Sequence, residues 1–491
     1  MSFAVRLVNF LNRQALHDVA TTRQFEHHLQ HGLPEHSLMA RAGLAVARLA
    51  LAIAPHAQRI WIAAGTGNNG GDGIVAAMHL QRWGKQPLMS WLGKPDQAPA
   101  DTRLAYQTAL DAGVAFGAGP PTHFDLCIDA LLGIGSQLRE PAGLMADWMH
   151  QINTCGAPVL AVDVPSGLQA DTGAASRCHV KATHTLSLLT LKPGLFTGQG
   201  RDLAGTVWLD DLRQDQSDPS APPPLPPSAW LAGRPLKTSR AHASHKGSFG
   251  DVAVVGGARG MSGAALLAAS AALHGGAGRV FVSLLDEQPL RLDTVQPELM
   301  FRDLDTLPLE TMSVVCGCGG GDAIAAQLPV ILKSAKHLVI DADGLNAIAQ
   351  FAPLQALLAE RGRQQHATIL TPHPLEAARL LACSAADIQT NRMAAAQQLA
   401  RRFACTVVLK GSGTVIAEAD VVPVINPTGN ARLATGGTGD VLAGLIGARL
   451  AAGLHTFDAA CQAVYQHGSA ADQWPQDQAL TASRLAQALK A

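Results

Sequence analysis

The chain is poor in charge of either sign, and its charges nearly cancel. Charged residues make up 15% of the 491 residues, and 37 Lys and Arg against 38 Asp and Glu leave a formal net charge of -1. Such a balance provides no broad basic surface for nucleic acid or for an anionic membrane. We therefore expect neither a nucleic acid nor a membrane among its partners.

Cysteine is scarce and poorly spaced for metal or redox chemistry. Of the eight cysteines, only Cys316 and Cys318 lie close together in the sequence. One intervening residue matches no common zinc or redox spacing. We expect reduced and mostly buried thiols.

Long hydrophobic runs are absent from the sequence. The most apolar stretch, GLAVARLALAIAP at 43–55, is interrupted by Arg48 and is too short to span a bilayer. The first residues include Arg6 and Arg13 and have no apolar core of the kind that a secretion signal requires. These features predict a soluble, cytoplasmic protein.

The composition is that of a globular protein, and one proline-rich segment divides the chain. Apolar residues make up 47% of the chain, and a chain of 491 residues is longer than one hydrophobic core normally supports. The segment QDQSDPSAPPPLPPSA has no helical or strand period, which is typical of a semi-rigid linker. We expect an N-terminal domain at 1–213, a linker at 214–229 and a C-terminal domain at 230–491.

Both halves alternate short apolar segments with amphipathic helical patterns. This alternation predicts parallel sheets with helices on both faces, and hence an α/β fold for each half. The expected strands lie within 59–65, 86–93, 124–133 and 157–165 in the first half, and within 250–257, 278–285, 313–319, 337–344, 367–373 and 405–411 in the second.

The loop AGTGNNGGDG at 64–73 joins the first expected strand to a helix. Its glycines fit the G-x-G-x-x-G phosphate fingerprint, but the next expected strand has no acid to hold a ribose. Asp72 instead lies at the helix start, where it would repel a pyrophosphate. The loop offers the side-chain oxygens of Asn68, Asn69 and Asp72, so a different ligand is indicated.

Two further strand ends carry oxygen donors. The motif IDALLGIG presents Asp129, and VDVPSGLQADTG presents Asp163, Ser166 and Asp171. Open α/β sheets bind ligands at the carboxyl ends of their strands, and oxygen donors without Cys or His favour a hard cation. Each residue alone could belong to an Asx-turn or a helix cap, but three such strand ends together favour a site.

Residues 7–210 resemble the NAD(P)H-hydrate epimerase family, the YjeF N-terminal domain. The resemblance rests on AGTGNNGGDG, DALLGIG, VDVPSGLQADTG and the leading LNRQALHDVA and GLPEHSLMARAG. It implies a Rossmann-like sheet that binds hydrated NADH or NADPH (NADHX, NADPHX) and one potassium ion. The implied substrate residues are Asn68, Asn69, Gly70, Gly71, Asp72, Gly133, Ile134, Gly135, Ser136, Gln137, Leu138, Arg139 and Asp163, and the implied potassium ligands are Asn69, Asp129 and Ser166.

Epimerisation of such a hydrate inverts a carbon that bears a hydroxyl beside the ring nitrogen, which requires proton transfer at that oxygen. Asp163 is our candidate for this acid–base step, which a positioned carboxylate accelerates by about 10²–10⁴-fold. Lys192, in LTLKPGL, follows a strand and is the second catalytic candidate. The alternative for Lys192 is a solvated lysine before a turn.

The second half carries two glycine-rich turns suited to phosphates. KGSGT at 410–414 follows a strand, and GGTGD at 436–440 precedes an apolar helix, whereas a Walker motif is absent. Amides at a helix start can stabilise a transferring phosphoryl group. We expect Asp440 to accept a hydroxyl proton, and we expect these amides to lower the pKa of its carboxyl.

Residues 235–490 resemble the ribokinase-like ADP-dependent NAD(P)H-hydrate dehydratase family. The resemblance rests on HKG, GGARGMSGAA, IDADGLNAI, TPHPLEAARLL, KGSGT and GGTGDVLAG, but GCGGG at 317–321 replaces the family's G-P-G-L-G. It implies ADP as co-substrate and a magnesium ion at the phosphates. The implied substrate residues are Ala264, Gly319, His373 and Asp440, and the implied ADP residues are Lys410, Gly411, Ser412, Gly413, Thr414 and Gly439.

Together the resemblances imply a bifunctional repair enzyme, with Asp440, Asp163 and Lys192 as its catalytic residues. Its partners would be NADHX, NADPHX and ADP, and we expect a homo-oligomer. GGTGD alone also suits a vitamin-precursor kinase of the same superfamily. A non-enzymatic scaffold, as in relatives that act in mRNA decapping, is the third possibility for the N-terminal half, against which NNGGD, Asp129 and Asp163 argue.

Overall fold

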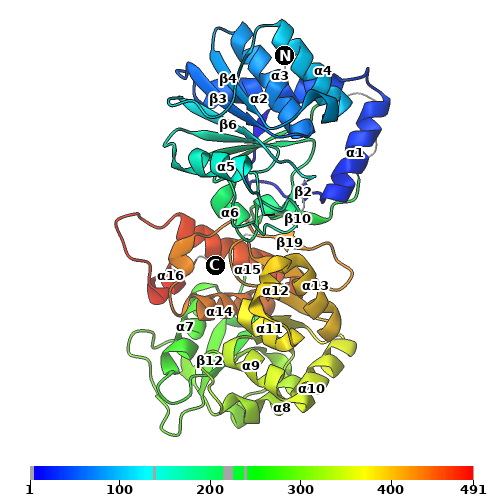
Figure 1. Cartoon of the computed structure of the whole chain (residues 1–491). Helices are drawn as coiled ribbons and strands as arrows, with labels where there is room; N and C mark the ends of the chain where they lie inside the picture. Colours follow the sequence, from blue (N-terminus) through cyan, green and yellow to red (C-terminus); the bar gives the residue numbers. More distant parts are fainter. Residues whose placement is uncertain (1–4, 136–139, 214–224, 237–239, 490–491) are drawn as a thin grey trace. The chain divides into compact units, whose positions relative to one another are not determined.

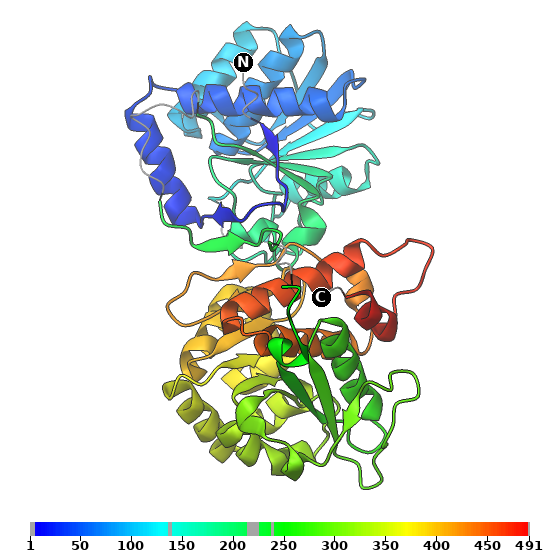
Figure 2. The same ribbon diagram turned by 180° about the vertical axis from the view of Figure 1, so that it is seen from behind.

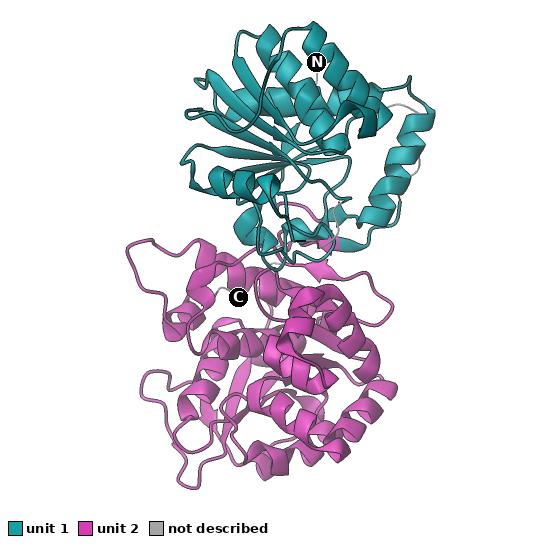
Figure 3. Ribbon diagram, viewed as in Figure 1, with its two compact units in different colours: residues 1–10, 14–229 teal, residues 11–13, 230–491 magenta. Residues whose placement is uncertain are grey.

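The computed structural model describes residues 5–135, 140–213, 225–236 and 240–489. The chain divides into two compact units, coloured separately in Figure 3. The N-terminal unit comprises residues 1–10 and 14–229, and the C-terminal unit comprises residues 11–13 and 230–491. Most of the expected linker, 214–224, lies outside the described residues, so its character stays a prediction.

The N-terminal unit is built on an eight-stranded sheet with the order β1-β9-β8-β7-β6-β3-β4-β5 (Figure 1). All neighbouring strands are parallel except β1 and β9. The strands are β1 (Arg6–Leu7), β3 (Arg59–Ala64), β4 (Gln86–Trp91), β5 (Ala115–Gly117), β6 (Leu126–Ala130), β7 (Val159–Val162), β8 (His184–Leu188) and β9 (Thr206–Asp210), and a short β2 (Gln14–Leu16) precedes the first helix. The helices are α1 (Val19–His31), α2 (Ser37–Ile53), α3 (Asn68–Arg82), α4 (Ala100–Asp111), α5 (Leu144–Thr154) and α6 (Gly200–Leu203).

Strand β3 shows why this sheet is covered on both faces. Its side chains alternate in direction, as the two-residue period of a strand requires. Ile60 and Ile62 are buried in the core that α2, α3 and α4 share with the sheet. Trp61 and Ala63 are buried in a second core with α5. The strand is therefore apolar along its length, which is the pattern that predicted a buried parallel strand.

The C-terminal unit contains a second sheet with the order β13-β12-β11-β14-β15-β16-β17-β18-β19-β10. Its neighbouring strands are parallel apart from the antiparallel contacts of β18 with β17 and β19. The strands are β10 (Ala229–Leu231), β11 (Asp251–Gly256), β12 (Arg279–Leu284), β13 (Met300–Phe301), β14 (Ser313–Cys316), β15 (His337–Ile340), β16 (Thr368–Leu370), β17 (Thr406–Leu409), β18 (Val415–Ala417) and β19 (Val424–Ile425).

Helices α7, α14, α15 and α16 share one core with this sheet, and α8 to α11 and α13 pack on one another (Figures 1 and 2). The α/β class predicted for both halves is confirmed. No helix in the described ranges combines the length and the hydropathy that a bilayer crossing needs. The helices are α7 (Ser262–His274), α8 (Ile324–Ser334), α9 (Ala342–Gln350), α10 (Ala352–Arg363), α11 (Pro374–Leu381), α12 (Ala385–Thr390), α13 (Arg392–Phe403), α14 (Thr438–Ala451), α15 (Thr456–Asp472) and α16 (Ala482–Ala488).

Candidate active sites

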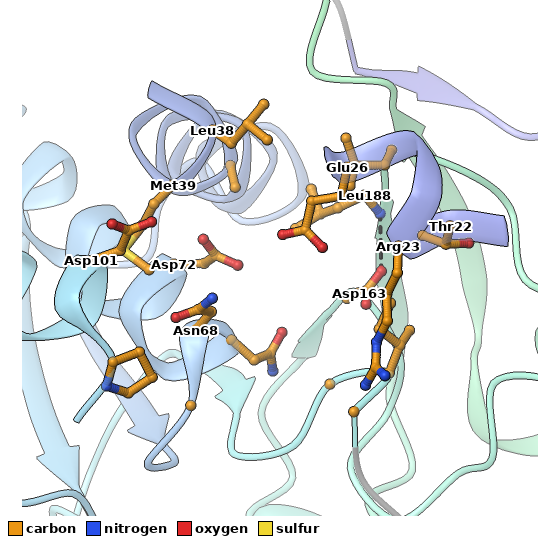
Figure 4. A pocket seen from close by; sticks show the side chains of 18 of the residues that line it. Thr22, Arg23, Glu26, Leu38, Met39, Asn68, Asp72, Asp101, Asp163 and Leu188 are labelled. Atoms are coloured by element: carbon orange, nitrogen blue, oxygen red, sulfur yellow. Dashed lines mark hydrogen bonds between the residues drawn. The ribbon is translucent and has the colours of Figure 1, made fainter. Parts of the chain in front are cut away.

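A cavity of about 450 Å³ opens at the carboxyl edge of the N-terminal sheet (Figure 4). The segments that follow β3, β6, β7 and β8 reach it, and α1, α2 and the start of α4 contribute the other walls. This edge is where open α/β sheets place their ligands. The lining residues are Thr22, Arg23, Glu26, Gln30, Leu38, Met39, Ala42, Thr66, Gly67, Asn68, Asn69, Asp72, Pro99, Asp101, Leu131, Leu132, Gly133, Ile134, Gly135, Asp163, Leu188, Leu189, Lys192 and Leu212.

The glycines of the first motif allow α3 to begin directly against the next strand's loop. A Cβ at Gly65 would lie 1.8 Å from the carbonyl oxygen of Leu131, and a Cβ at Gly70 would lie 2.2 Å from that of Gly65. No side chain caps α3, so its first amides give the cavity a partial positive charge. Of the expected substrate residues here, Asn68, Asn69 and Asp72 line the cavity, whereas Gly70 and Gly71 are buried.

The turn after β6 supplies a second part of the cavity wall. Gly133, Ile134 and Gly135 line it, as the family resemblance implied for substrate residues. The remaining four expected residues of this turn lie outside the described residues, and they are Ser136, Gln137, Leu138 and Arg139.

The three expected potassium ligands meet around that same turn. Ser166 donates its hydroxyl to Asp129 Oδ1 (2.6 Å) and its amide to Oδ2 (2.8 Å). The Leu132 amide donates to Ser166 Oγ (2.8 Å). The side chain of Asn69 lies against Gly133, where a Cβ would be 3.2 Å from Asn69 Oδ1. Three oxygen-bearing side chains from three strand ends therefore approach one loop.

Asp129 is a fully buried carboxyl group. Burial raises its pKa to about 6, although hydrogen bonds from Ser166 and from the Leu131 amide act in the opposite direction. Within the described ranges no Lys, Arg or His forms an ion pair with it. Buried charges in proteins are normally paired or bound to a metal, and hard cations take oxygen ligands. The donor set therefore fits a hard cation.

Asp163, labelled in Figure 4, forms a buried ion pair with Lys192 at the cavity wall. Lys192 is fully buried, and its Nζ also donates to the carbonyl oxygen of Leu188 (2.6 Å). The Leu188 amide in turn donates to Asp163 Oδ1 (3.2 Å). Asp163 has φ 67, a left-handed conformation that non-glycine residues seldom adopt outside functional sites and turns. Because Lys192 is fully buried, the alternative of a solvated lysine is wrong.

Sequence reasoning missed the charged groups that α1 and α4 bring to this cavity. Arg23 and Glu26 lie on α1, and Asp101 lies on α4, in segments without a recognisable motif. The only sequence signal was Asp18, which caps α1 by accepting the Thr21 amide (2.8 Å). Asp171, grouped with the strand ends from the sequence, accepts the Val19 amide (2.8 Å) and anchors the start of α1 instead.

In the C-terminal unit, Asp440 lies in the first turn of α14, directly after the left-handed turn at Gly437 (φ 91). Donor atoms of Asp440, Cys318 and Asp341 lie within 4.8 Å of one another. Burial, followed by the Asp341 charge, raises the pKa of Asp440 to about 6, against the effect of the Cys318 hydrogen bond and Lys410. The expectation that helix-start amides lower this pKa is wrong, because burial and a second carboxylate outweigh them.

Lys410 connects the two phosphate-type turns of this unit. Its Nζ donates to Asp341 Oδ1 (2.5 Å) and lies 3.9 Å from Glu376 Oε2. Burial lowers the pKa of Lys410, but the two carboxylates outweigh burial, and the net pKa is raised. A Cβ at Gly439 would lie 3.5 Å from Lys410 Nζ. The expected ADP residues Lys410 and Gly439 thus lie next to each other.

His373 and Glu376 form a capping box at the start of α11. His373 Nδ1 accepts the Leu375 amide (3.1 Å), and the His373 amide donates to Glu376 Oε2 (2.7 Å). His373 Nε2 lies 3.1 Å from Glu376 Oε1. Because Glu376 also neighbours Lys410 Nζ, the expected substrate residue His373 belongs to the same network of side chains.

The turn GCGGG keeps a defined shape although Cys318 replaces the proline of the family pattern. Gly319 has φ 59, and its Cβ would lie 2.7 Å from the Met261 carbonyl oxygen and 2.9 Å from Ala264 Cβ. The Ala258 amide donates to the Gly319 carbonyl oxygen (2.7 Å). Burial and then Asp440 raise the pKa of the Cys318 thiol well above its usual range. The expected substrate residues Ala264 and Gly319 are therefore in contact.

Arg392, which sequence reasoning missed, supports the turn KGSGT through hydrogen bonds to its backbone. Its guanidinium is buried and donates to the carbonyl oxygens of Leu409 and Lys410 (3.1 Å each). A Cβ at Gly411, which has φ 132, would lie 3.0 Å from that guanidinium. Thr414 Oγ1 donates back to the Gly411 carbonyl oxygen (3.1 Å). Gly411 and Ser412 are exposed, Gly413 is buried and Thr414 is partly buried.

Comparison with known proteins matches each unit to a family. Residues 35–194 match the family described as YjeF-related protein N-terminus, and residues 252–491 match NAD(P)H-hydrate dehydratase. A solved structure, the ADP/ATP-dependent NAD(P)H-hydrate dehydratase from Bacillus subtilis co-crystallized with ATP/Mg2+, is 29% identical with a TM-score of 0.43. It is matched over 51% of this chain and 91% of that one.

Full-length relatives match across both units. The bifunctional NAD(P)H-hydrate repair enzyme Nnr of Escherichia coli (strain K12) is 37% identical over 465 residues, which cover 90% of this chain and 85% of that protein. The enzyme of the same name from Coxiella burnetii is 35% identical over 458 residues, covering 90% and 91%.

Each of the two units has a mainly parallel sheet and one cluster of acidic and basic side chains. These features are those of a two-domain α/β enzyme. The chain belongs to the bifunctional NAD(P)H-hydrate repair enzymes, with a YjeF-related N-terminal part and an NAD(P)H-hydrate dehydratase C-terminal part. The two family resemblances drawn from the motifs are confirmed.

Proposed function

We propose that the N-terminal unit interconverts the R and S epimers of NADHX and NADPHX, and that the C-terminal unit dehydrates the S epimer. Dehydration would consume ADP and release AMP and phosphate. Epimerisation would make the R form available to a stereospecific dehydratase. The proposal is supported by two separate acid–base clusters, Asp163 with Lys192 in one unit and Asp440 with Asp341 in the other. A cytoplasmic location and a homo-oligomeric state remain predictions.

In the N-terminal cavity, the hydrated ring would lie beside Asp163, with Lys192 balancing the carboxylate charge. The amides at the start of α3 would face the nucleotide phosphates, as helix N-termini do in other nucleotide sites. The residues proposed to hold the substrate are Asn68, Asn69, Gly70, Gly71, Asp72, Gly133, Ile134, Gly135 and, in the part of the turn that is not described, Ser136, Gln137, Leu138 and Arg139.

Potassium, when bound, would supply a positive charge that offsets the buried carboxylate of Asp129. Asn69, Asp129 and Ser166 would hold it, because all three offer oxygen and approach the same turn. Asp129 would then keep its negative charge, and Ser166 would keep the turn after β6 in register through the Leu132 amide (2.8 Å). That turn also carries Gly133, which lines the cavity.

In the C-terminal unit, Asp440 would take the proton from the ring hydroxyl. The oxygen would attack the β-phosphorus of ADP, the bond to the AMP oxygen would break, and AMP would leave. Loss of phosphate with the neighbouring proton would then restore the ring double bond. Phosphorylation is useful because hydroxide is a poor leaving group and phosphate is a good one.

The ADP phosphates would rest on the turn Lys410, Gly411, Ser412, Gly413 and Thr414 and on the amide of Gly439. Magnesium, bound with ADP, would neutralise charge on the transferring group. The Asp341 carboxylate offers oxygen ligands of the kind that magnesium prefers, which leaves Asp440 to act as the base. Ala264, Gly319 and His373 would contact the hydrated nucleotide.

The test is to incubate the protein with each purified epimer of NADHX, ADP and magnesium, and to follow NADH absorbance. Recovery of NADH from both epimers is expected. Recovery from the S epimer alone would leave only the dehydratase. Recovery from neither, together with phosphorylation of a vitamin precursor alcohol by the same preparation, would favour the kinase alternative.

A further inference from the structure

Helix α1 directs one carboxylate into the N-terminal cavity. Glu26 lines the cavity, and Figure 4 shows its carboxyl group between Asp72 and Asp163 in this view. Among the described residues, no hydrogen bond or ion pair engages the Glu26 carboxylate. An unpaired and partly buried carboxylate in a cavity is free to exchange protons with a bound molecule.

The position of Glu26 is fixed through its helix. The start of α1 is held by the Val19 amide, which donates to Asp171 (2.8 Å). One turn before Glu26, the buried hydroxyl of Thr22 hydrogen bonds with that of Thr190 (2.7 Å), just beyond β8. Residues 22, 23, 26 and 30 all line the cavity, as the helical period requires of one face. Glu26 is therefore presented by a rigid element.

The charges around Glu26 favour a carboxyl group that holds a proton more readily than usual. Burial raises the pKa of Glu26, and Asp163 and Asp101 raise it further, against Arg23 and Lys192. On the facing start of α3, the pKa of Asp72 is raised well above its usual range by burial and then by Asp163 and Glu26. Ionising Glu26 and Asp72 together carries an electrostatic cost, so the protonated form of each is favoured more than in an isolated carboxyl group.

Asp163 alone is poorly suited to serve both faces of a reacting carbon. Lys192 and the Leu188 amide both donate to its Oδ1, and its backbone is in the left-handed region. A carboxylate whose Oδ1 accepts two hydrogen bonds stays on one side of a bound ring. When inversion proceeds by loss and return of water, the hydroxyl leaves from one face of the carbon and water arrives at the other, so a second proton-transferring group is needed.

We propose that Glu26 is a catalytic residue of the epimerase, working opposite Asp163; this inference rests on the proposed epimerase function. One carboxyl group donates a proton to the hydroxyl oxygen, the carbon–oxygen bond breaks, and water leaves as the ring-nitrogen electron pair forms a C=N bond. Water then adds to the opposite face, its proton passes to the other carboxylate, and the electron pair returns to nitrogen. The roles exchange for the reverse epimer.

The test compares wild type, Glu26→Gln and Glu26→Asp in epimerase assays between about pH 5 and 9. Glu26→Gln should lower kcat by about 10²-fold or more, with a smaller change in KM, and should lose one limb of the wild-type pH profile. Glu26→Asp should recover part of the rate and the limb. In water enriched in ¹⁸O, wild-type product should carry the label at the inverted carbon.

Controls separate this inference from folding and from the proposed function. Asp111→Asn removes an exposed carboxylate at the end of α4 and should leave the rate and the pH profile unchanged. An unchanged melting temperature of the N-terminal unit would exclude misfolding of Glu26→Gln. An active wild type with an unaltered Glu26→Gln profile, or product without label, would overturn the inference. A wild type that does not epimerise would overturn the proposed function instead.

Discussion

Two aspartates at the candidate active sites differ because of the side chains that face them. Asp163 is paired with the buried ammonium of Lys192. Asp440 faces Asp341 and the Cys318 thiol, and its pKa of about 6 lies close to neutral pH. A general base works best when its pKa is near the working pH, because it is then both ionised and basic. Asp440 is therefore suited to accepting a hydroxyl proton.

Replacing Asp440 with Asn should lower the dehydration rate by about 10²-fold or more. Wild-type dehydration should rise with pH through about 6, where the base ionises, and level off above it. A carboxyl whose pKa is raised on folding contributes stability at low pH that is lost as pH rises through the folded pKa. Asp440→Asn avoids that loss, so its melting temperature at pH 7 should equal or exceed that of wild type.

Measurements of NADH formation from the S epimer, across the pH range and in both proteins, check this prediction. ADP binding by Asp440→Asn should persist, because the phosphates would rest on Lys410 to Thr414. Epimerase activity serves as the internal control and should be unchanged. Near-normal dehydration by the variant would remove Asp440 from the mechanism.

Potassium should stabilise the N-terminal unit, and more strongly at pH 7.5 than at pH 5. The raised pKa of Asp129 means that its ionised form destabilises the fold as pH rises through about 6. A cation bound beside the carboxylate offsets this effect, whereas a proton replaces the cation at low pH. Thermal unfolding in potassium chloride against choline chloride of equal ionic strength measures the shift. Asp129→Asn should abolish it, and an equal shift in that variant would contradict the site.

At the scale of elements, α14 can carry Asp440 into its cluster because glycine lets two helices approach. A Cβ at Gly444 in α14 would lie 1.9 Å from the carbonyl oxygen of Ala268 in α7. Gly444→Ala should therefore force the helices apart, destabilise the C-terminal unit by roughly 1–3 kcal/mol and reduce dehydration. Gly263→Ala in α7, where a Cβ meets nothing within 4 Å, should leave stability unchanged or raise it by up to about 1 kcal/mol, because Ala favours a helix more than Gly does. Urea unfolding measures the stability of both variants. An equal effect of the two substitutions would mean that close packing at Gly444 is not the cause.

The elements that could be predicted are those whose burial produces a recognisable pattern of apolar residues in the sequence. Strands such as β3, β6, β7 and β11 are apolar on both faces, and each expected strand was found within its predicted range. Glycine turns were also predictable, since few residues fit φ values like 132 at Gly411. These signals are local, so a single segment of sequence contains them.

Features that depend on distant segments could not be predicted. Arg23 and Glu26 enter the cavity only because α1 is anchored to Asp171 and Thr190, far along the chain. The pKa of Asp440 is set by burial and by Asp341, which another strand end supplies. The GCGGG turn lacks the proline of the family pattern, yet a Cβ at Gly319 would lie within 3.0 Å of atoms of Met261 and Ala264, which lie far along the chain. Tertiary neighbours decided each of these cases.

At the scale of the whole molecule, the division between units is not a single cut in the sequence. Residues 11–13 belong to the C-terminal unit, although residues on both sides of them belong to the N-terminal unit. Within the C-terminal unit, the Arg13 guanidinium lies 4.4 Å from the centre of the Trp230 ring. A Cβ at Gly233 would lie 2.3 Å from the Arg13 amide nitrogen, so this short segment packs closely.

Expressing residues 1–219 and 220–491 as separate chains should give two folded proteins, because each unit has its own sheet and core. The first should epimerise and the second should dehydrate. The second should melt below the same unit in the intact chain, because it lacks the segment 11–13. Arg13→Ala in the full chain should reproduce part of that loss, about 0.5–1 kcal/mol for an exposed cation–π contact. Calorimetry of the fragments, the variant and the intact chain measures these differences. If neither fragment folds, the two-domain interpretation of the chain is wrong.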